Sequence, residues 1–429
     1  MKTCTWMWTI VITLFATLLL AVVATPSAQA QTLTVLHNFT GPDGAAPIAG
    51  LTTDRGGNLY GAAQFGGAHS VGSAFKLAHQ GSGWLFTLLY NFAGGSDGSL
   101  PAARVIFGPD GSLYSTTEQG GTIGVACPAG CGTVFSLKPP PPSAPFGPWI
   151  HTVLYRFNGG TDARYPAAQV VFDRAGNLYS TSQSGGSGCS GGGGCGTVFE
   201  LMPSGVRWTE RVIYSFLGRP TDGANSQSEV IFDNAGNLYG TTISGGAYQQ
   251  NGTVFKLAPS GSGWTESVLH SFQGVLDGAN PNGGLVSDPS GNLYGVTTNA
   301  DGQGHGGGTV FELTPSMGSW TFNLDYTFSV LRCCQCGPWR TLVMDQAGNL
   351  YGTTLCGGTH AFGSVFKLTH SGGQWTYTSL HDFTGGSDGG FPISNLVFDA
   401  SGNLYGTASA GGTGSACYGG CGLIFEIAP

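Results

Sequence analysis

Apolar segments of strand length recur along this chain in a fixed order, separated by short stretches rich in Gly, Asp, Pro and Ser. One set comprises EVIFD (229–233), NLYGTT (237–242), GTVFKLA (252–258) and WTESVLHSF (264–272). Apolar runs of this length, bounded by turn-forming residues, predict β-strands. We name the four strands of such a unit a, b, c and d in chain order.

The motif GNLYG or a near copy marks strand b of each unit, and its tyrosine gives the period of the repeat. Successive tyrosines are 54, 65, 60, 55, 57 and 54 residues apart: Tyr60, Tyr114, Tyr179, Tyr239, Tyr294, Tyr351 and Tyr405. Seven four-stranded units of this size predict an all-β fold, a seven-bladed β-propeller.

The two ends of the chain supply complementary parts of one unit. Residues 33–39 (LTVLHNF) read as a strand d with no strand before it, and residues 422–429 (GLIFEIAP) as a strand c with no strand d after it. We therefore expect strand 33–39 to pair with the C-terminal strands and to close the last blade. Closure of the ring would also remove exposed sheet edges.

Two features of the repeat predict its turns and its core. Six units place an Asp at the start of a short a–b turn: Asp54, Asp173, Asp233, Asp288, Asp345 and Asp399. In strand d a Trp precedes a closing Phe by eight residues, as in Trp264 and Phe272. An even spacing predicts that both rings face the same side of the strand. We expect these aromatics to fill the gaps between adjacent sheets.

The pattern GNLYGTT…GG…GTVFKL…W…L..F.GG.DG resembles the Gloeo/Verruco (GloVer) repeat of exported bacterial proteins, the choice-of-anchor tandem-repeat GloVer-containing proteins. The resemblance covers essentially all of residues 32–429. It implies no particular activity and no catalytic residues. Members of that name often carry a C-terminal anchoring segment, whereas this chain ends at Pro429 directly after a strand.

Residues 1–30 are predicted to be a signal peptide. An apolar run from Trp6 to Val23 is followed by Ala28 and Ala30, which form an A-x-A cleavage site before Gln31. An uncleaved anchor helix is the alternative, since the run is near the length that spans a membrane. Residues 31–429 are then expected to be a single propeller domain with no further membrane span, secreted to the periplasm or the extracellular space.

The charge balance excludes some partners. Without Lys2 the chain has 14 basic and 23 acidic residues, a formal net charge of −9. This argues against binding to nucleic acid or to anionic membrane surfaces. With only 9% charged residues and 75 glycines, the composition fits a β-protein with many tight turns, and we expect a monomer.

The spacing between landmarks varies most between strands b and c. From the Tyr of strand b to the Phe of strand c the gaps are 15, 21, 20, 16, 17, 15 and 20 residues. In a propeller the b–c and d–a loops emerge on the same face. Because function concentrates in variable loops on a rigid scaffold, we expect a ligand to bind on this face.

Ten cysteines remain after Cys4 is removed with the signal peptide, and disulfides are expected in an exported chain. The three longest b–c loops each contain a local pair: Cys127 and Cys131, Cys189 and Cys195, and Cys417 and Cys421. Unit six contains Cys333, Cys334, Cys336 and Cys356, for which three pairings are open. A four-thiolate zinc or copper site is the alternative for these four.

Candidate ligand-binding residues lie in the loops. Six d–a loops carry an Asp: Asp43, Asp97, Asp162, Asp222, Asp277 and Asp388. Each is expected to cap its own turn, the alternative being a ring of oxygen ligands for Ca²⁺ or sugar hydroxyls. His69, His305 and His360 lie in b–c loops and are the candidate acid/base groups, whereas His37, His270 and His381 replace a strand-d Tyr and are expected to be structural.

No catalytic motif is present: the chain contains no G-x-S-x-G, P-loop or H-E-x-x-H sequence. The leading hypothesis is therefore a binding or interaction scaffold that recognises a polysaccharide, a protein or another cell-envelope component, without a cofactor. An extracellular lyase or glycoside-acting enzyme with its site at the central opening is the second hypothesis. A structural envelope protein is the third.

Overall fold

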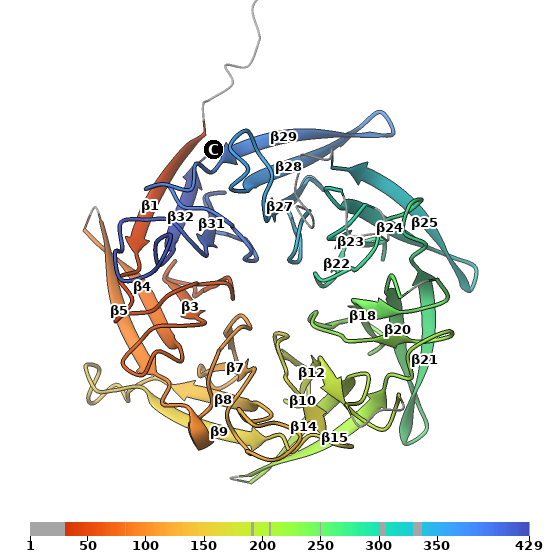
Figure 1. The fold of residues 1–429 in the computed structure, drawn as a ribbon, viewed down its shortest axis with the longest axis horizontal. Helices are drawn as coiled ribbons and strands as arrows, with labels where there is room; N and C mark the ends of the chain where they lie inside the picture. The colour runs from red at the N-terminus through yellow and green to blue at the C-terminus, as the bar shows by residue number, and fades with distance from the viewer. Residues whose placement is uncertain are drawn as a thin grey trace, which may run out of the picture.

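The computed structural model describes residues 31–428, apart from 82, 190–192, 206, 249, 301–305 and 329–336. The predicted signal peptide lies outside the described residues. Within the described part there is no α-helix, and the main strands form seven four-stranded antiparallel sheets arranged as a ring (Figure 1). The seven-bladed β-propeller predicted from the repeat is confirmed.

Each blade follows the order a-b-c-d, with strand a innermost and strand d outermost (Figure 1). Blade 1 comprises β2 (Leu51–Thr53), β3 (Leu59–Ala63), β4 (Ser73–Gln80) and β5 (Gly83–Asn91). Blade 2 comprises β6 (Ile106–Phe107), β7 (Leu113–Thr117), β8 (Thr133–Lys138) and β9 (Ile150–Arg156). Blade 3 comprises β11 (Val171–Phe172), β12 (Leu178–Ser182), β14 (Thr197–Ser204) and β15 (Arg207–Ser215).

The next three blades repeat the same arrangement. Blade 4 comprises β17 (Ile231–Phe232), β18 (Leu238–Thr242), β20 (Thr253–Ser260) and β21 (Gly263–Ser271). Blade 5 comprises β22 (Val286–Ser287), β23 (Leu293–Thr297), β24 (Thr309–Ser316) and β25 (Ser319–Thr327). Blade 6 comprises β26 (Val343–Met344), β27 (Leu350–Thr354), β28 (Ser364–Ser371) and β29 (Gln374–Asp382).

Blade 7 is built from both ends of the chain. It comprises β30 (Val397–Phe398), β31 (Leu404–Ala408), β32 (Leu423–Ala428) and β1 (Thr32–Asn38). Strand β1 pairs antiparallel with β32, with Thr32 opposite Ala428 and Asn38 opposite Leu423. Figure 1 shows the red first strand beside the blue last strand. The predicted closure of the last blade by strand 33–39 is therefore confirmed.

The a–b turns form as predicted, with the Asp as their organising side chain. In blade 4, Asp233 Oδ1 accepts hydrogen bonds from the backbone N–H groups of Ala235 and Asn237, and its Oδ2 accepts from the Tyr239 hydroxyl at 3.0 Å. Burial opposes ionisation, but these hydrogen bonds hold the pKa of Asp233 below its ordinary value. Gly236 takes a φ of 83°, a conformation that favours glycine.

The core consists of seven aromatic clusters, one in each gap between neighbouring blades. The closing Phe of each strand d packs edge-on against the Phe of strand c in the next blade, with ring centroids 4.9 to 5.3 Å apart. The seven pairs are Phe39/Phe75, Phe92/Phe135, Phe157/Phe199, Phe216/Phe255, Phe272/Phe311, Phe328/Phe366 and Phe383/Phe425. Each such pair stabilises by about 0.5–1.5 kcal/mol beyond the area it buries.

The Trp and the closing Phe of one strand d do not face the same side, contrary to the prediction. Trp84 packs against Tyr405 of blade 7, whereas Phe92 of the same strand packs against Phe135 of blade 2. The reason is a register shift between β4 and β5 at Ala74/Phe75, where one extra residue reverses the alternation. The same shift recurs in every c–d pair, so each strand d fills the gaps on both of its sides.

Two glutamates occupy a position of strand d at which other blades carry an aromatic ring, such as Phe86, in the gap between neighbouring blades. Glu210 of β15 faces Asp162 and Tyr155 of blade 2, and Glu266 of β21 faces Asp222 of blade 3. One oxygen of each glutamate is buried without a hydrogen-bond partner. Burial, followed by the adjacent carboxylate, raises the pKa of Glu210 to about 8 and that of Glu266 to about 7.

Deleting residues 31–39 from the mature chain should lower the free energy of unfolding by more than about 5 kcal/mol. Loss of the buried Phe39 alone corresponds to roughly 3–5 kcal/mol, and blade 7 also loses its outer strand. The matched control replaces the exposed nine-residue c–d loop 139–147 with a two-residue turn. Urea unfolding should show little change for this control, and an equally small change for the 31–39 deletion would contradict the closure.

The double variant Glu210→Gln, Glu266→Gln should flatten the dependence of stability on pH. A folded-state pKa above the unfolded value stabilises the fold at low pH, and this contribution is lost as pH rises through about 7 to 8. The variant should match the wild type at pH 4.5 and exceed it by roughly 1–3 kcal/mol at pH 8.5. Parallel pH profiles in urea unfolding would refute this assignment.

Candidate functional site

The b–c and d–a loops lie on one face of the ring, where they pair with each other. Backbone bridges join Ala45 to Phe65 in blade 1 and Ala279 to Asn299 in blade 5. In blades 3 and 4 the two loops form short two-stranded ribbons: β10 (Ala163–Arg164) with β13 (Ser184–Gly185), and β16 (Gly223–Ala224) with β19 (Ser244–Gly245). We call this surface the loop face. The a–b and c–d turns lie on the opposite face.

The six predicted d–a carboxylates are each engaged within their own loop. Asp97, at the end of a short 3-10 turn (Gly95–Asp97), accepts from the Tyr90 hydroxyl and from the Ala93 N–H, both at 2.7 Å. A strand-d His or Tyr contacts the Asp in six blades: His37/Asp43, Tyr90/Asp97, Tyr155/Asp162, Tyr214/Asp222, His270/Asp277 and His381/Asp388. The six Asp side chains thus cap separate loops, and their binding of a ligand stays a prediction.

The two predicted histidines that the structure describes lie in different blades. His69 and His360 are exposed in the b–c loops of blades 1 and 6, and His305 lies outside the described residues. By contrast, His37 is stacked on Phe86 at 3.9 Å, and burial, opposed by Asp43, lowers its pKa. Among the residues described, no three His, Cys, Asp or Glu side chains gather in a group that could hold a metal ion.

The three predicted local disulfides are present: Cys127–Cys131, Cys189–Cys195 and Cys417–Cys421. In each of these b–c loops, the backbone carbonyl of the second cysteine accepts a hydrogen bond from the neighbouring d–a loop. In blade 2 the donor is the N–H of Tyr165, at 2.9 Å. In unit six Cys356 is buried, while Cys333, Cys334 and Cys336 lie outside the described residues.

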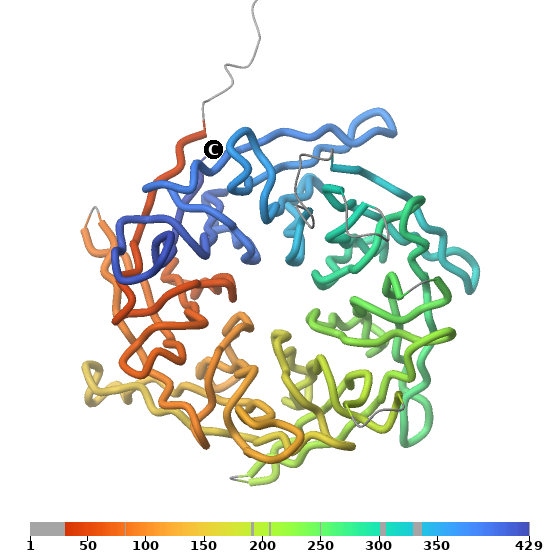
Figure 2. Tube along the Cα trace, viewed as in Figure 1, coloured from red at the N-terminus to blue at the C-terminus, as the bar shows by residue number. Residues whose placement is uncertain are grey.

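Side chains from different blades do meet at the start of the innermost strands. A buried aliphatic residue stands at or immediately before the first residue of each strand a, and the residue that precedes it is, in blade order, Gly50, Arg104, Gln169, Glu229, Gly284, Thr341 and Asn395. Figure 2 shows the inner parts of the blades arranged around the middle of the ring. The polar members of this set, together with Glu118 and Arg340, form what we call the axial cluster.

Glu229 of blade 4 is the centre of the axial cluster. Its Oε1 accepts from the Thr341 hydroxyl of blade 6 at 2.5 Å and from the Asn395 amide of blade 7 at 3.1 Å. Blades 4 and 7 lie on opposite sides of the ring (Figure 1), so these bonds cross its axis. Gly284 makes room for them, since a Cβ there would lie 2.7 Å from Glu229 Cγ.

Two arginines complete the axial cluster. Arg104 donates its Nε–H to Gln169 Oε1 at 2.5 Å, and Arg340 donates its Nε–H to the carbonyl of Ile393 at 3.2 Å. Burial lowers the pKa of both guanidinium groups, and the charge of Glu229 opposes this in both cases. Burial also raises the pKa of Glu118, opposed by the positive charge of Arg340.

The axial cluster lies at the loop-face end of the ring. The chain enters strand a from the d–a loop, and Glu118 directly follows β7 where the b–c loop of blade 2 begins. Glu229 and Asn395 are almost fully buried, whereas Arg104, Gln169 and Arg340 are half-buried. The terminal nitrogens of Arg104 and Arg340 make no hydrogen bond to the described residues, yet none of them is a fully buried, unpartnered atom, so they keep contact with solvent.

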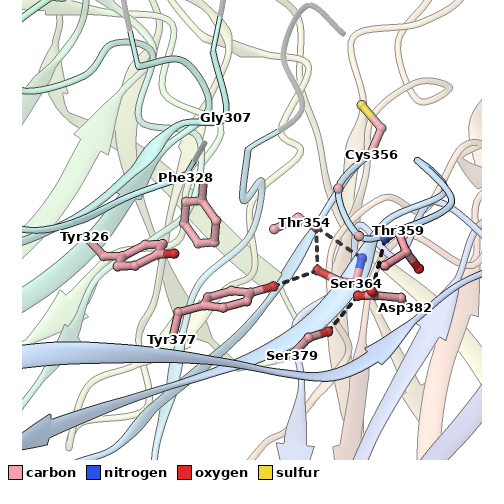
Figure 3. Close-up of a pocket in the computed structure, with 12 residues that line it drawn as sticks. Gly307, Tyr326, Phe328, Thr354, Cys356, Thr359, Ser364, Tyr377, Ser379 and Asp382 are labelled. Carbon is pink, nitrogen blue, oxygen red and sulfur yellow. Dashed lines mark hydrogen bonds between the residues drawn. The ribbon is translucent and has the colours of Figure 1, made fainter. Parts of the chain in front are cut away.

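A separate pocket of about 260 Å³ lies between blades 5 and 6 (Figure 3). Tyr326 and Tyr377 form its aromatic wall, while Asp382 accepts from the Ser379 hydroxyl at 2.6 Å and from the Thr359 N–H at 3.0 Å. Residues 329–336, which directly follow the lining residue Phe328, lie outside the described residues. We therefore assign no function to this pocket.

The comparisons with known proteins identify the family. The sequence profile of the Gloeobacter/Verrucomicrobia repeat matches residues 22–191 and 128–335. The chain belongs to this repeat family. A search of curated proteins found no match to this GloVer-repeat protein.

Solved structures resemble the GloVer-repeat protein in fold alone. A fungal alcohol oxidase in complex with copper is 11% identical, with a TM-score of 0.54 over 93% of this chain and 76% of that one. A putative oxidoreductase (glucose dehydrogenase) from Thermus thermophilus is 17% identical, with a TM-score of 0.44 over 78% and 98%. A protein of unknown function from Dyadobacter fermentans is 11% identical, with a TM-score of 0.46 over 93% and 98%.

Sequence reasoning missed the axial cluster of this GloVer-repeat protein, although a signal was present. Only 9% of its residues are charged, yet Arg104, Glu229 and Arg340 lie beside the innermost strands, where other units have small or neutral residues. A comparison of the seven units column by column would have found them.

Replacing both Cys127 and Cys131 with Ser should lower the free energy of unfolding of this GloVer-repeat protein by about 2 kcal/mol. The disulfide closes only a short loop, so the lost constraint on the unfolded chain is modest. Urea unfolding of the variant and of the wild type, each with and without reductant, measures the effect. If the variant were as stable as the oxidised wild type, this disulfide would have no stabilising role.

Proposed function

We propose that this protein is an exported binding protein that recognises a polysaccharide or another cell-envelope component through its loop face. Export is supported by the predicted signal peptide and by three disulfides, which form in oxidising compartments. Within the described part of the chain, no helix is long and apolar enough to cross a membrane.

The observation that carries the proposal is the axial cluster. Its guanidinium, amide, hydroxyl and carboxylate groups offer both donors and acceptors from blades on different sides of the ring. Sugar hydroxyls both donate and accept, so they match such a mixed set. A few convergent polar groups in a rigid frame are typical of a ligand-binding site.

Exposed aromatic side chains on the loop face support the same proposal. Most aromatic rings of this protein are packed between blades, but Phe65, Tyr248, Phe362 and Tyr418 are exposed in b–c loops. Aromatic rings present flat apolar surfaces on which the C–H faces of sugar rings pack. These four residues lie on the same face as the open end of the axial cluster.

An extracellular lyase or glycoside-acting enzyme is the second candidate, and one observation favours it. Glu118 has a raised pKa beside the positive charge of Arg340, near the centre of the ring. A carboxyl group with a raised pKa is suited to proton transfer. Formation of new reducing or unsaturated ends from a bound polysaccharide, lost in Glu118→Gln, would establish this alternative.

A polysaccharide array with the mature protein should give binding that depends on the loop face. A triple variant in which Ala replaces Phe65, Phe362 and Tyr418 should bind the polysaccharide of highest affinity at least tenfold more weakly, because stacking surfaces are lost. Affinity is measured by isothermal titration calorimetry with oligosaccharides of that polymer.

Phe146→Ala is the matched control for these substitutions. Phe146 is fully exposed in a c–d loop on the opposite face, so its removal should leave binding unchanged. Binding to no polysaccharide and to no extracted envelope fraction would refute the proposal and favour a structural role. An equal loss with Phe146→Ala would show that the loop face is not the site.

A further inference from the structure

Two arginines of the axial cluster present guanidinium groups that their protein partners do not saturate. A guanidinium carries five N–H donors. Among the described residues, Arg104 and Arg340 each make one side-chain hydrogen bond, through Nε, to Gln169 and to the Ile393 carbonyl. Their terminal nitrogens hydrogen-bond to neither Glu118 nor Glu229.

The two guanidinium groups act on the same small region. Arg104 comes from blade 2 and Arg340 from blade 6, yet both interact electrostatically with Glu229 of blade 4. The Nε–H hydrogen bond of each arginine, to Gln169 or to the Ile393 carbonyl, restricts the orientation of its guanidinium group. None of the terminal nitrogens is a fully buried, unpartnered atom, so these N–H groups keep contact with solvent.

A guanidinium group with a fixed orientation and two N–H groups free of protein partners is well suited to bind a carboxylate through two parallel hydrogen bonds. Glu229 cannot fill this role for both arginines, because its Oε1 is occupied by Thr341 and Asn395. An external carboxylate would supply the missing acceptors.

We infer that the axial cluster binds the carboxylate of a uronate, an acidic sugar unit, within the polysaccharide that the loop face recognises. This inference rests on the proposed function and names its ligand class. A free or C-terminal peptide carboxylate would use the same two arginines. The uronate is favoured because the flanking Gln169, Thr341 and Asn395 supply neutral groups that match ring hydroxyls, and because exposed aromatic side chains lie in b–c loops of the same face.

The test uses isothermal titration calorimetry with the mature protein and oligosaccharides of several uronate polymers, including polygalacturonate and alginate. Each is compared with its carboxyl-reduced counterpart, which keeps the sugar rings and replaces the charge with a hydroxyl. We expect at least one uronate oligosaccharide to bind, and carboxyl reduction to weaken its binding at least tenfold. Acidic peptides are included and are expected not to bind.

Variants of the two arginines localise the effect. Arg104→Gln and Arg340→Gln should each weaken uronate binding at least tenfold without changing affinity for the carboxyl-reduced oligosaccharide. Arg104→Lys, which keeps the charge but loses the planar pair of donors, should show an intermediate loss. Arg174→Gln, in an exposed a–b turn on the opposite face, is the matched control, and thermal unfolding verifies that each variant is folded.

The outcomes separate this inference from the proposed function. Tight binding of a neutral polysaccharide that is insensitive to Arg104→Gln and Arg340→Gln would overturn the inference and leave the binding function standing. Preference for an acidic peptide would also overturn it. If no polysaccharide binds but an extracted envelope fraction does, the inference alone is overturned; if neither binds, the proposed function is refuted as well.

Discussion

The packing of one phenylalanine against another across every gap between blades is the contact on which this propeller depends. Strand d of each blade carries the first ring and strand c of the next blade carries the second, so no blade completes its core alone. Because the pairing runs in one direction around the ring, the last blade must meet the first. The pairing of β1 with β32 brings Phe39 to Phe75 and completes the series.

The repeat was sufficient to predict this scaffold because its strands, turns and closing aromatics recur with nearly constant spacing. It predicted the seven blades, the closing strand, the Asp-centred turns such as that of Asp233, and the three local disulfides. It failed where one residue changes the alternation. The extra residue in strand d reverses the side on which Phe92 lies relative to Trp84, and no pattern of apolar positions signals that bulge.

The axial cluster could not be predicted in the same way, because it is formed by residues that the repeat does not share. Glu229 meets Asn395, 166 positions away, only because the ring brings blades 4 and 7 together across the axis. A search for short motifs detects neighbours along the chain, whereas these partners are neighbours only after closure. The Asp residues of the d–a loops recur in the repeat and are therefore easy to recognise, although each is engaged within its own blade, as Asp97 is by Tyr90 of strand d.

The blade repeat itself does not require charged residues at the axis. Blades 1 and 5 have glycine at the position that Arg104 and Glu229 occupy, and blades 6 and 7 have the neutral Thr341 and Asn395. Desolvating charged groups is unfavourable, and neutral residues that fill the same space often stabilise a protein as well or better. Closure of the ring does not require two half-buried guanidinium groups whose terminal N–H groups make no hydrogen bond to the described residues. Their presence beside Glu229, where side chains of blades 4, 6 and 7 meet, is the observation on which the proposed ligand binding rests.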